Sequence, residues 1–480
     1  MPDKLKLQVS ELEQQLERGQ ISRRDFLRSL ALLGLSLGAS EILAACGKQP
    51  APDQTPTPKY PEFDPGFGEA TAGPAPTSAW TGPGDEPAPT GEAPPGPTAI
   101  PPKKISWLCT ACGEHFPNAE ALGRHTLKEH WRRLPDIQRV DQPTYRQYLV
   151  GRVERFDERN TVFSRLLWDE KYQAQVQAAA AKAPQDGWEA FEGQALVAGA
   201  IFVDDAAGSL HPGYYGYSGH VREAGGLYDW DEPPNAKRFP VPDPVWMAER
   251  IKQVARIYGA DLVGITQVDP RWVYSHYYEL ATGNNGKLEI SYPYAIVIGI
   301  EMDWKGINES PEFEASAATA LAYSRMAELS ASLAKYIRSL GYPAIPCGND
   351  SAQSIPLAID AGLGELGRNG LLLSPEFGPR QRICKVFTDL PLQPDKPVDF
   401  GIQSYCETCH ACAQSCPVDA IRWADRTTET TSISNRKGIL RWPVDVARCY
   451  LFWTENGCDC SNCVAACPWA LQNPRDWLEL

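Results

Sequence analysis

Two runs of closely spaced cysteines near the C-terminus constrain this chain more than any other feature of its sequence. Nine of its 14 cysteines lie between residues 406 and 467. The first run has the spacing Cys-x2-Cys-x2-Cys-x3-Cys-Pro and consists of Cys406, Cys409, Cys412, Cys416 and Pro417. This is the spacing of bacterial ferredoxins, in which thiolates hold 4Fe–4S clusters and the fourth cysteine of a run binds the neighbouring cluster. The run therefore predicts iron–sulfur ligation at this end of the chain.

The second run repeats the ending of the first but lacks one cysteine. Its members are Cys460, Cys463, Cys467 and Pro468. Gly457 occupies the position at which the first ligand is expected, so either Cys449 or Cys458 must supply the missing thiolate. We favour Cys449, because Cys458 is only two residues from Cys460 and would strain the loop around the cluster.

Exchange of the fourth ligands between the two runs predicts two 4Fe–4S clusters. The first cluster is expected on Cys406, Cys409, Cys412 and Cys467. The second is expected on Cys416, Cys449, Cys460 and Cys463. Disulfides or zinc could use the same thiols, but the two Cys-Pro endings argue against both. Two adjacent clusters would carry single electrons to another centre, which the rest of the chain should hold.

Residues 1–46 are typical of a twin-arginine export signal. Arg23 and Arg24 are followed by Phe26 and Leu27, and then by an apolar run over residues 30–39 that is too short to span a bilayer comfortably. An ordinary amphipathic helix with two arginines is the alternative. The residues Leu-Ala-Ala-Cys at 43–46 resemble a lipobox, so we expect Cys46 to be lipidated; cleavage at a small-residue site would instead leave Cys46 incidental.

The two ends of the chain are consistent with each other. Residues 47–104 are dominated by Pro, Gly, Thr, Ala and acidic residues without apolar periodicity, which predicts a disordered linker. Iron–sulfur clusters are assembled in a reducing cytoplasm, and the twin-arginine route exports proteins already folded around their cofactors. We therefore expect a redox protein on the outer face of the cytoplasmic membrane. The net charge of −14 argues against nucleic acid as the main partner.

The body of the chain alternates helical and strand patterns. Helical periodicity covers residues 245–259 and 316–341, the second stretch ending at Gly341. Short apolar runs rich in β-branched residues occupy 260–268, 294–302 and 343–347. The alternation predicts a layered arrangement of helices and strands.

Residues 315–326 and 341–392, together with both cysteine runs, resemble the catalytic subunit of respiratory reductive dehalogenases. The resemblance covers roughly residues 240–480 and the export signal. It implies an α+β fold with a nitroreductase-like, corrinoid-binding core at 241–400 and a ferredoxin-like domain with two 4Fe–4S clusters at 401–480. Residues 136–240 would form the N-terminal part of the body.

The resemblance also implies a corrinoid without a protein axial ligand, and the chain lacks an Asp-x-His-x-x-Gly site that would place a histidine on cobalt. A glycine-rich stretch at 360–370 would let the backbone approach a flat macrocycle closely. Its glycines are Gly362, Gly364, Gly367 and Gly370. A loop with helix caps is the alternative interpretation.

The active-site residues implied by the resemblance are Tyr323, Asn349 and Arg382. A phenol with a pKa of about 10 is a weak acid, and a nearby guanidinium favours the phenolate that remains after it donates a proton. The guanidinium can also stabilise a departing halide, and the asparagine can orient the phenol or the substrate. A helical tyrosine that is merely packed is the structural alternative for Tyr323.

Residues 105–135 depart from the pattern of that family, because they match a C2H2 zinc finger. The expected ligands are Cys109, Cys112, His125 and His130, with Phe116 and Leu122 at the apolar positions. Two thiolates and two imidazoles suit tetrahedral zinc. A redox-active or disulfide-bonded Cys109–Cys112 pair beside two unrelated histidines is the alternative. A structural clip or a docking surface is expected rather than a reader of DNA, since the finger is single and the chain is acidic.

The predicted reaction is R–X + 2e⁻ + H⁺ → R–H + X⁻ on a small organohalide, as the terminal step of organohalide respiration. The expected partners are a membrane-anchor subunit and a respiratory electron donor. An epoxyqueuosine-reductase-like enzyme is one alternative, against which the export signal and Tyr323 argue. A non-enzymatic electron-transfer subunit is another, and corrinoid content would distinguish it. A nucleic-acid binder led by residues 105–135 is disfavoured by the acidic balance.

Overall fold

The structure, a computed structural model, describes most of the chain between Trp107 and Ala470. The described residues are 107–109, 112–117, 121–122, 125, 129, 137–183, 188–205, 232–279 and 283–470. The predicted export signal, Cys46, the linker and His130 lie outside them. Among the described residues, no helix combines the length and the apolar character needed to cross a membrane.

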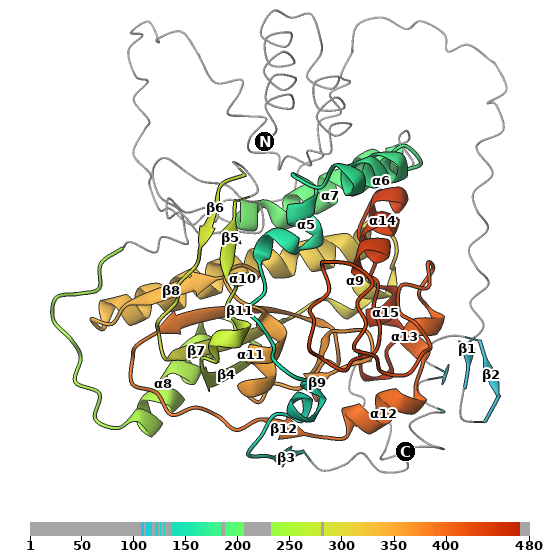
Figure 1. Cartoon of the computed structure of the whole chain (residues 1–480). Coiled ribbons are helices and arrows are strands. Elements are labelled where there is room, and N and C mark those ends of the chain that lie inside the picture. The colour runs from blue at the N-terminus through green and yellow to red at the C-terminus, as the bar shows by residue number, and fades with distance from the viewer. Residues whose placement is uncertain are drawn as a thin grey trace, which may run out of the picture. The chain divides into compact units, whose positions relative to one another are not determined.

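A four-stranded sheet forms the centre of the described body (Figure 1). Its order is β4(Leu262–Gln267), β7(Tyr294–Glu301), β11(Gln381–Thr388) and β8(Ala344–Cys347). All three neighbouring pairs run antiparallel. The three predicted strands are confirmed as β4, β7 and β8, whereas β11 carries Arg382 and was not predicted as a strand.

Helices cover both faces of this sheet. On one face, α8(Pro244–Ile257) and α10(Phe313–Ser339) bury Ile296, Ile298 and Ile300 of β7. On the other face, α11(Ser354–Asp360) packs with the alternate residues Ala295 and Val297. The alternation of buried residues on β7 follows from the two-residue period of a strand. The antiparallel sheet with its covering helices confirms the mixed α+β class, while the nitroreductase-like description of the core stays a prediction.

The two predicted long helices are confirmed, and their ends have local causes. Asp243 caps α8 by accepting hydrogen bonds from the backbone N–H groups of Val245 and Trp246, and Pro244 occupies the first helical position. The 27-residue α10 ends before Gly341, which has a φ of +86°. This left-handed conformation suits glycine and stops the helix.

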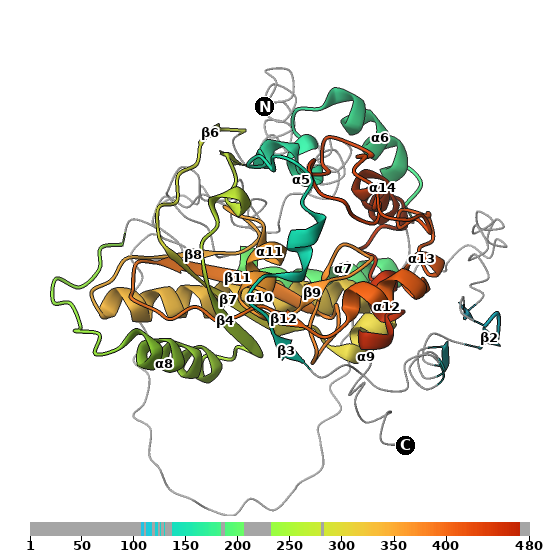
Figure 2. The ribbon, with the colours of Figure 1, turned by 60° about the horizontal axis from the view of Figure 1, so that its bottom comes forward.

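The N-terminal part of the body is helical. It contains α5(Val162–Arg165), α6(Glu170–Ala180) and α7(Trp188–Asp205). α7 packs along α10, and α6 lies beside α14(Val446–Asn456), as Figure 1 and Figure 2 both show. Segments far apart in the sequence therefore meet around the cysteine-rich region.

The cysteine-rich region is built from short helices. These are α12(Ile402–Thr408), α13(Ala411–Gln414), α14 and α15(Asn462–Ala465). Hydrogen bonds join this region to the core: Arg380 Nε donates to the carbonyl of Ala470 over 3.0 Å, and Gln403 Nε2 donates to that of Leu366 over 2.7 Å. The boundary predicted at residue 400 is crossed by these contacts, and the division into domains stays a prediction.

The remaining elements are strands of two or three residues, one short α-helix and four 3-10 helices among the described residues. They are β1(Trp107–Leu108), β2(His115–Phe116), β3(Gln138–Arg139), β5(His276–Tyr278), β6(Asn285–Lys287), β9(Glu365–Leu366), β10(Leu372–Leu373), β12(Val398–Asp399), α9(Trp304–Asn308) and the 3-10 helices at Thr144–Tyr148, Glu158–Asn160, Pro270–Trp272 and Pro468–Ala470. β1 pairs with β2, and β3 pairs with β12.

Candidate active site and iron–sulfur sites

Three separate elements bring Tyr323, Asn349 and Arg382 together. Tyr323 lies on α10, Asn349 follows β8, and Arg382 lies on β11. Asn349 Nδ2 donates a hydrogen bond to the phenol oxygen of Tyr323 over 2.8 Å. The Arg382 guanidinium carbon lies 4.7 Å from the centroid of the Tyr323 ring. The three residues implied by the resemblance therefore form one site, although their catalytic roles stay a prediction.

The surroundings of Tyr323 act on its acidity in opposite directions. Its side chain is buried, and burial is the main cause that raises the pKa of the phenol. The positive charge of Arg382 and the hydrogen bond from Asn349 oppose this rise in pKa, whereas the carboxylates of Asp204 and Asp459 add to it. The site therefore holds a protonated phenol beside a cation that stabilises its conjugate base.

Arg382 has an unsatisfied donor at this site. Its Nε is buried and has no hydrogen-bond partner among the described residues. A buried N–H without a partner is costly, and such groups are commonly satisfied by water or a ligand. The donor suits an anion or a polar group of a bound molecule next to Tyr323.

Two acidic residues at this site were missed by the sequence analysis. Asp204 lies in the last turn of α7, where its backbone N–H donates to Ser324 Oγ over 3.3 Å, and burial together with Asp205 raises its pKa to about 7. Asp459 lies inside the second cysteine run, where its backbone N–H donates to Ser316 Oγ on α10 over 2.8 Å. Burial raises the pKa of Asp459, and Arg382 opposes that rise. No spacing in the sequence signals either residue, because both reach the site only through packing.

The first predicted set of cysteines surrounds a small cavity. The four residues Cys406, Cys409, Cys412 and Cys467 all line it. Arg368 and Asn369 line the same cavity, and Arg368 Nε donates to the carbonyl of Cys406 over 2.8 Å. Thiolates around one space beside a guanidinium fit a 4Fe–4S cluster, whose negative charge the cation would offset. We refer to these four cysteines as the first cluster site.

The second predicted set also converges. Cys416, Cys449 and Cys463 belong to one packed group. Burial, followed by the nearby Cys460 and Cys416, raises the pKa of Cys449 to about 12. Cys458 is engaged elsewhere, since its Sγ lies 3.1 Å from the carbonyl oxygen of Pro311. These contacts agree with the preference for Cys449 over Cys458, and we refer to Cys416, Cys449, Cys460 and Cys463 as the second cluster site.

The four glycines expected to contact a corrinoid have another role in the structure. A Cβ on Gly364 would lie 2.1 Å from the carbonyl oxygen of Leu373, and a Cβ on Gly362 would lie 2.4 Å from that of Lys396. A Cβ on Gly367 would lie 2.3 Å from the Leu373 side chain, whereas Gly370 is required by its φ of +78°. The chain's own packing accounts for these glycines, and they do not form a visible cradle for a macrocycle.

The zinc-finger segment brings three of its four predicted ligands together. The ligand atoms of Cys109, Cys112 and His125 all lie within 4.8 Å of one another. His130, the fourth predicted ligand, lies outside the described residues. Two sulfurs and an imidazole therefore lie close together, and the binding of zinc by this group stays a prediction.

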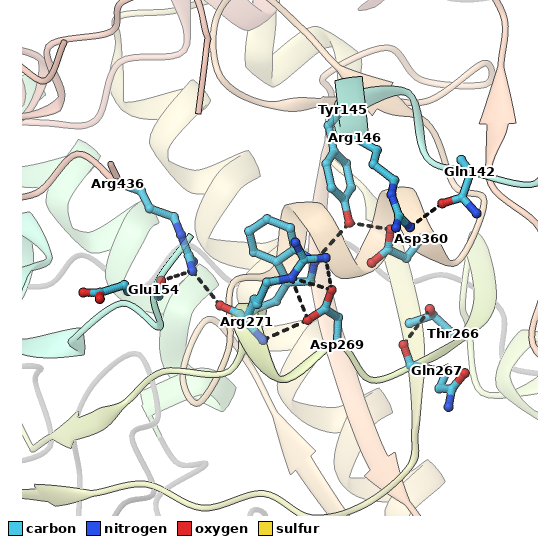
Figure 3. Close-up of polar contacts among 11 residues, drawn as sticks. Gln142, Tyr145, Arg146, Glu154, Thr266, Gln267, Asp269, Arg271, Asp360 and Arg436 are labelled. Carbon is cyan, nitrogen blue, oxygen red and sulfur yellow. Dashed lines mark hydrogen bonds and ion pairs between the residues drawn. The ribbon is translucent and has the colours of Figure 1, made fainter. Parts of the chain in front are cut away.

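A separate polar cavity of about 240 Å³ lies on the α11 side of the sheet (Figure 3). Tyr145 OH donates to Asp360 Oδ1 over 2.7 Å and accepts from Trp272 Nε1 over 3.0 Å. Arg271 pairs with Asp269 beside them. Burial raises the pKa of Asp360 to about 7. These groups satisfy one another, so we interpret the arrangement as a brace between the N-terminal segment and the core.

Comparison with known proteins places these sites in context. Residues 405–471 match the 4Fe-4S dicluster domain family, which agrees with iron–sulfur ligation by both runs. The wider chain is similar to reductive dehalogenases, a class of oxidoreductases.

Among these, the tetrachloroethene reductive dehalogenase of Sulfurospirillum multivorans is 37% identical over 316 residues, which are 59% of this chain and 62% of that protein. Solved structures of a reductive dehalogenase, one described as B12-dependent and one in complex with 3-bromo-4-hydroxybenzoic acid, match with 26% identity and a TM-score of 0.54, covering 72% of this chain and 45% of theirs. The epoxyqueuosine reductase of Lactococcus garvieae is 32% identical over only 97 residues, 26% of its length. The chain thus spans less than two thirds of the length of each of these relatives.

Proposed function

We propose that this protein is a reductive dehalogenase that replaces the halogen of an organohalide by hydrogen, using a corrinoid supplied with electrons by two 4Fe–4S clusters. The observation that carries the proposal is the convergence of Tyr323, Asn349 and Arg382, with the charge of Asp459 from the second cysteine run acting on Tyr323 and Arg382. The similarity to dehalogenases, one of which is described as acting on tetrachloroethene, supports the same class of substrate. The much shorter similarity to an epoxyqueuosine reductase makes that alternative weaker.

The protein's own residues divide the reaction between proton supply and charge stabilisation. Tyr323 donates the proton that the product carbon needs, and the hydrogen bond from Asn349 stabilises the phenolate that is left. Arg382 stabilises the same phenolate, and its unpaired Nε is available to a departing halide. Burial of Tyr323 excludes water, which would otherwise compete as a proton donor and as a ligand of the anion.

The second cluster site is the one expected to deliver electrons to this reaction. Asp459, adjacent to Cys460, contacts Ser316 on α10. Ser316 precedes Tyr323 by two helical turns, which correspond to roughly 10 Å along the helix. The first cluster site would then receive electrons from outside and pass them singly to the second.

A corrinoid would supply the two-electron chemistry at the carbon–halogen bond. The unsatisfied donor of Arg382 fits a molecule bound beside Tyr323. Close contacts within the chain account for Gly362, Gly364 and Gly367, and a positive φ accounts for Gly370, so we assign no residue the task of holding the macrocycle.

The proposal is tested by anaerobic production of the full chain with a corrinoid. We expect the purified protein to contain about eight iron atoms per chain and one corrinoid, and to release halide from members of a panel of chlorinated and brominated alkenes and arenes. A protein that contains iron and sulfide but no corrinoid would be an electron-transfer subunit and would contradict the proposal.

The export signal and the location belong to the same proposal. Residues 1–46 would direct the folded protein through the twin-arginine route, and lipidation at Cys46 would hold it on the outer face of the cytoplasmic membrane near a membrane-anchor subunit and a respiratory electron donor. Replacement of Arg23 and Arg24 by lysine should leave the protein in the cytoplasm. Unchanged export of that variant would argue for another route.

Zinc on Cys109, Cys112 and His125, with His130 as the fourth ligand, completes the proposed set of metals. The ion would have a structural role, since two thiolates and two imidazoles fill the four positions of a closed tetrahedral site.

A further inference from the structure

The hairpin formed by β1 and β2 has the internal geometry of a metal site. Cys112 Sγ lies 3.2 Å from His125 Nε2, and Cys109 Sγ completes the group. Two ligands of one tetrahedral zinc ion stand roughly 3.5 Å apart, given Zn–S and Zn–N bonds of about 2.3 and 2.0 Å. The observed spacing therefore leaves room for one ion between the three residues.

The second nitrogen of His125 supports this geometry. His125 Nδ1 lies 3.5 Å from a carboxylate oxygen of Glu114, on the side opposite to Cys112. Histidines that bind zinc commonly direct the other ring nitrogen toward a carboxylate or carbonyl, which fixes the ring and its tautomer. The turn itself is closed by Gly113, whose N–H donates to the carbonyl of Cys109 over 2.7 Å.

The hairpin docks on the loop that carries the first cluster site. Leu108 donates its N–H to Gln414 Oε1 over 3.0 Å, and Gln414 Nε2 donates to the carbonyl of Leu108 over 2.8 Å. This reciprocal pair joins residues that are 306 positions apart in the sequence. Gln414 ends α13, the short helix that contains Cys412.

The hairpin also shares its apolar interior with that loop. Cys109 and Leu122 are each 3% exposed, and they form one buried group with Ala411, which lies between Cys409 and Cys412. Cys409 and Phe116 pack against the edge of the same group. Two strands of two residues each cannot form a stable core alone, so the hairpin needs both its metal and this contact.

We propose that Zn²⁺ bound by Cys109, Cys112 and His125 holds the hairpin as a cover over the Cys409–Cys412 side of the first cluster, and that the cover shields this cluster from water and oxidants. Zinc has no redox chemistry under these conditions, so it takes no electron and displaces only the thiol protons on binding. Solvent exposure is one of the properties that set the stability and potential of iron–sulfur clusters. Loss of the metal should therefore affect the first cluster and leave the second unchanged.

The test compares variants of the full, cluster-containing chain purified without oxygen. His125→Gln removes one ligand, and His115→Gln is the matched control, because His115 is an exposed histidine of the same hairpin outside the metal group. Gln414→Leu keeps the ligands but removes the reciprocal pair with Leu108. Zinc is measured by mass spectrometry, and cluster lifetime is measured by loss of visible absorbance after exposure to air.

We expect about one zinc per chain in the wild type and in His115→Gln, and none in His125→Gln. The half of the visible absorbance that comes from the first cluster should be lost several-fold faster in His125→Gln than in the wild type. The same faster loss is expected in Gln414→Leu, although that variant retains zinc. Wild-type protein stripped of zinc by a chelator should behave like His125→Gln, which controls for misfolding of the variant.

Absence of zinc from the wild type, or equal cluster lifetimes in the wild type and the stripped protein, would overturn the proposal. The inference rests on the iron–sulfur and zinc parts of the proposed function, and not on its dehalogenase activity. Its readouts are zinc content and cluster lifetime, so a failure here is distinguishable from a failure to release halide.

Discussion

The first cluster site packs against the β1–β2 hairpin, whereas the second packs against α10 near Tyr323. Ala411 of the first loop is buried with Cys109 and Leu122 of the hairpin. In the second loop, Ser461 N–H donates to Ser310 Oγ over 2.7 Å, and Asp459 contacts Ser316. The regular ferredoxin spacing thus belongs to the site that contacts the hairpin, and the irregular spacing belongs to the site that contacts α10. Under the proposed function, this difference would correspond to distinct tasks, electron uptake for the first site and delivery of electrons to the substrate for the second.

The largest expected effect comes from replacing Cys449, the ligand that takes the place of the cysteine missing from the second run. Cys449→Ser should remove or convert the second cluster, because a thiolate from α14 is lost, and dehalogenation should fall at least about 100-fold. Cys458→Ser is the matched control and should leave both clusters and most of the activity intact, since Cys458 contacts Pro311. Electron paramagnetic resonance of the reduced protein measures the clusters. Loss of a cluster in Cys458→Ser, with both retained in Cys449→Ser, would reverse the assignment.

A smaller effect is expected from replacing Asp459, whose carboxylate lies next to Cys460 of the second cluster site and acts on Tyr323. Asp459→Asn removes a carboxylate that raises the pKa of the phenol, so that pKa should fall. The alkaline limb of the dehalogenation rate, where Tyr323 loses its proton, should then move to lower pH. Asp425→Asn is the matched control beside the first loop, where Asp425 acts on Arg368, and it should leave the limb in place.

The pH profiles of the two variants and the wild type are measured with saturating substrate and reductant. A shift of the alkaline limb to higher pH in Asp459→Asn, or equal shifts in both variants, would mean that Tyr323 is not the group that limits the rate.

The sequence predicted the parts of the fold whose pattern is local. Helical periodicity predicted α8 and α10, and β-branched runs predicted β4, β7 and β8. These elements are predictable because apolar residues recur along each of them in a local pattern typical of a buried helix or strand. β11 was not predicted as a strand, although it carries Arg382. The cysteines of the first cluster site follow directly from their spacing and line one cavity as expected.

The site around Tyr323 was predictable only in part. Its three principal residues came from the resemblance to dehalogenases, since no periodicity connects α10, β8 and β11. Asp204 and Asp459 were missed, because they approach Tyr323 through the packing of α7 and of the second loop on α10. The glycines of 362–370 were assigned to a macrocycle, whereas close approach of the chain to itself accounts for Gly362, Gly364 and Gly367, and a positive φ accounts for Gly370. These features depend on packing between segments that are far apart in the sequence, and no local pattern in a single sequence predicts such packing.

The most direct test of the account compares Tyr323→Phe with the wild type, both loaded with corrinoid and clusters. Phenylalanine keeps the ring over which Arg382 lies but removes the proton that Tyr323 donates. We expect halide release to fall by about 10²–10⁴-fold, with corrinoid content and both cluster signals unchanged. Halide release at the wild-type rate in this variant would contradict the central claim that Tyr323 supplies the proton.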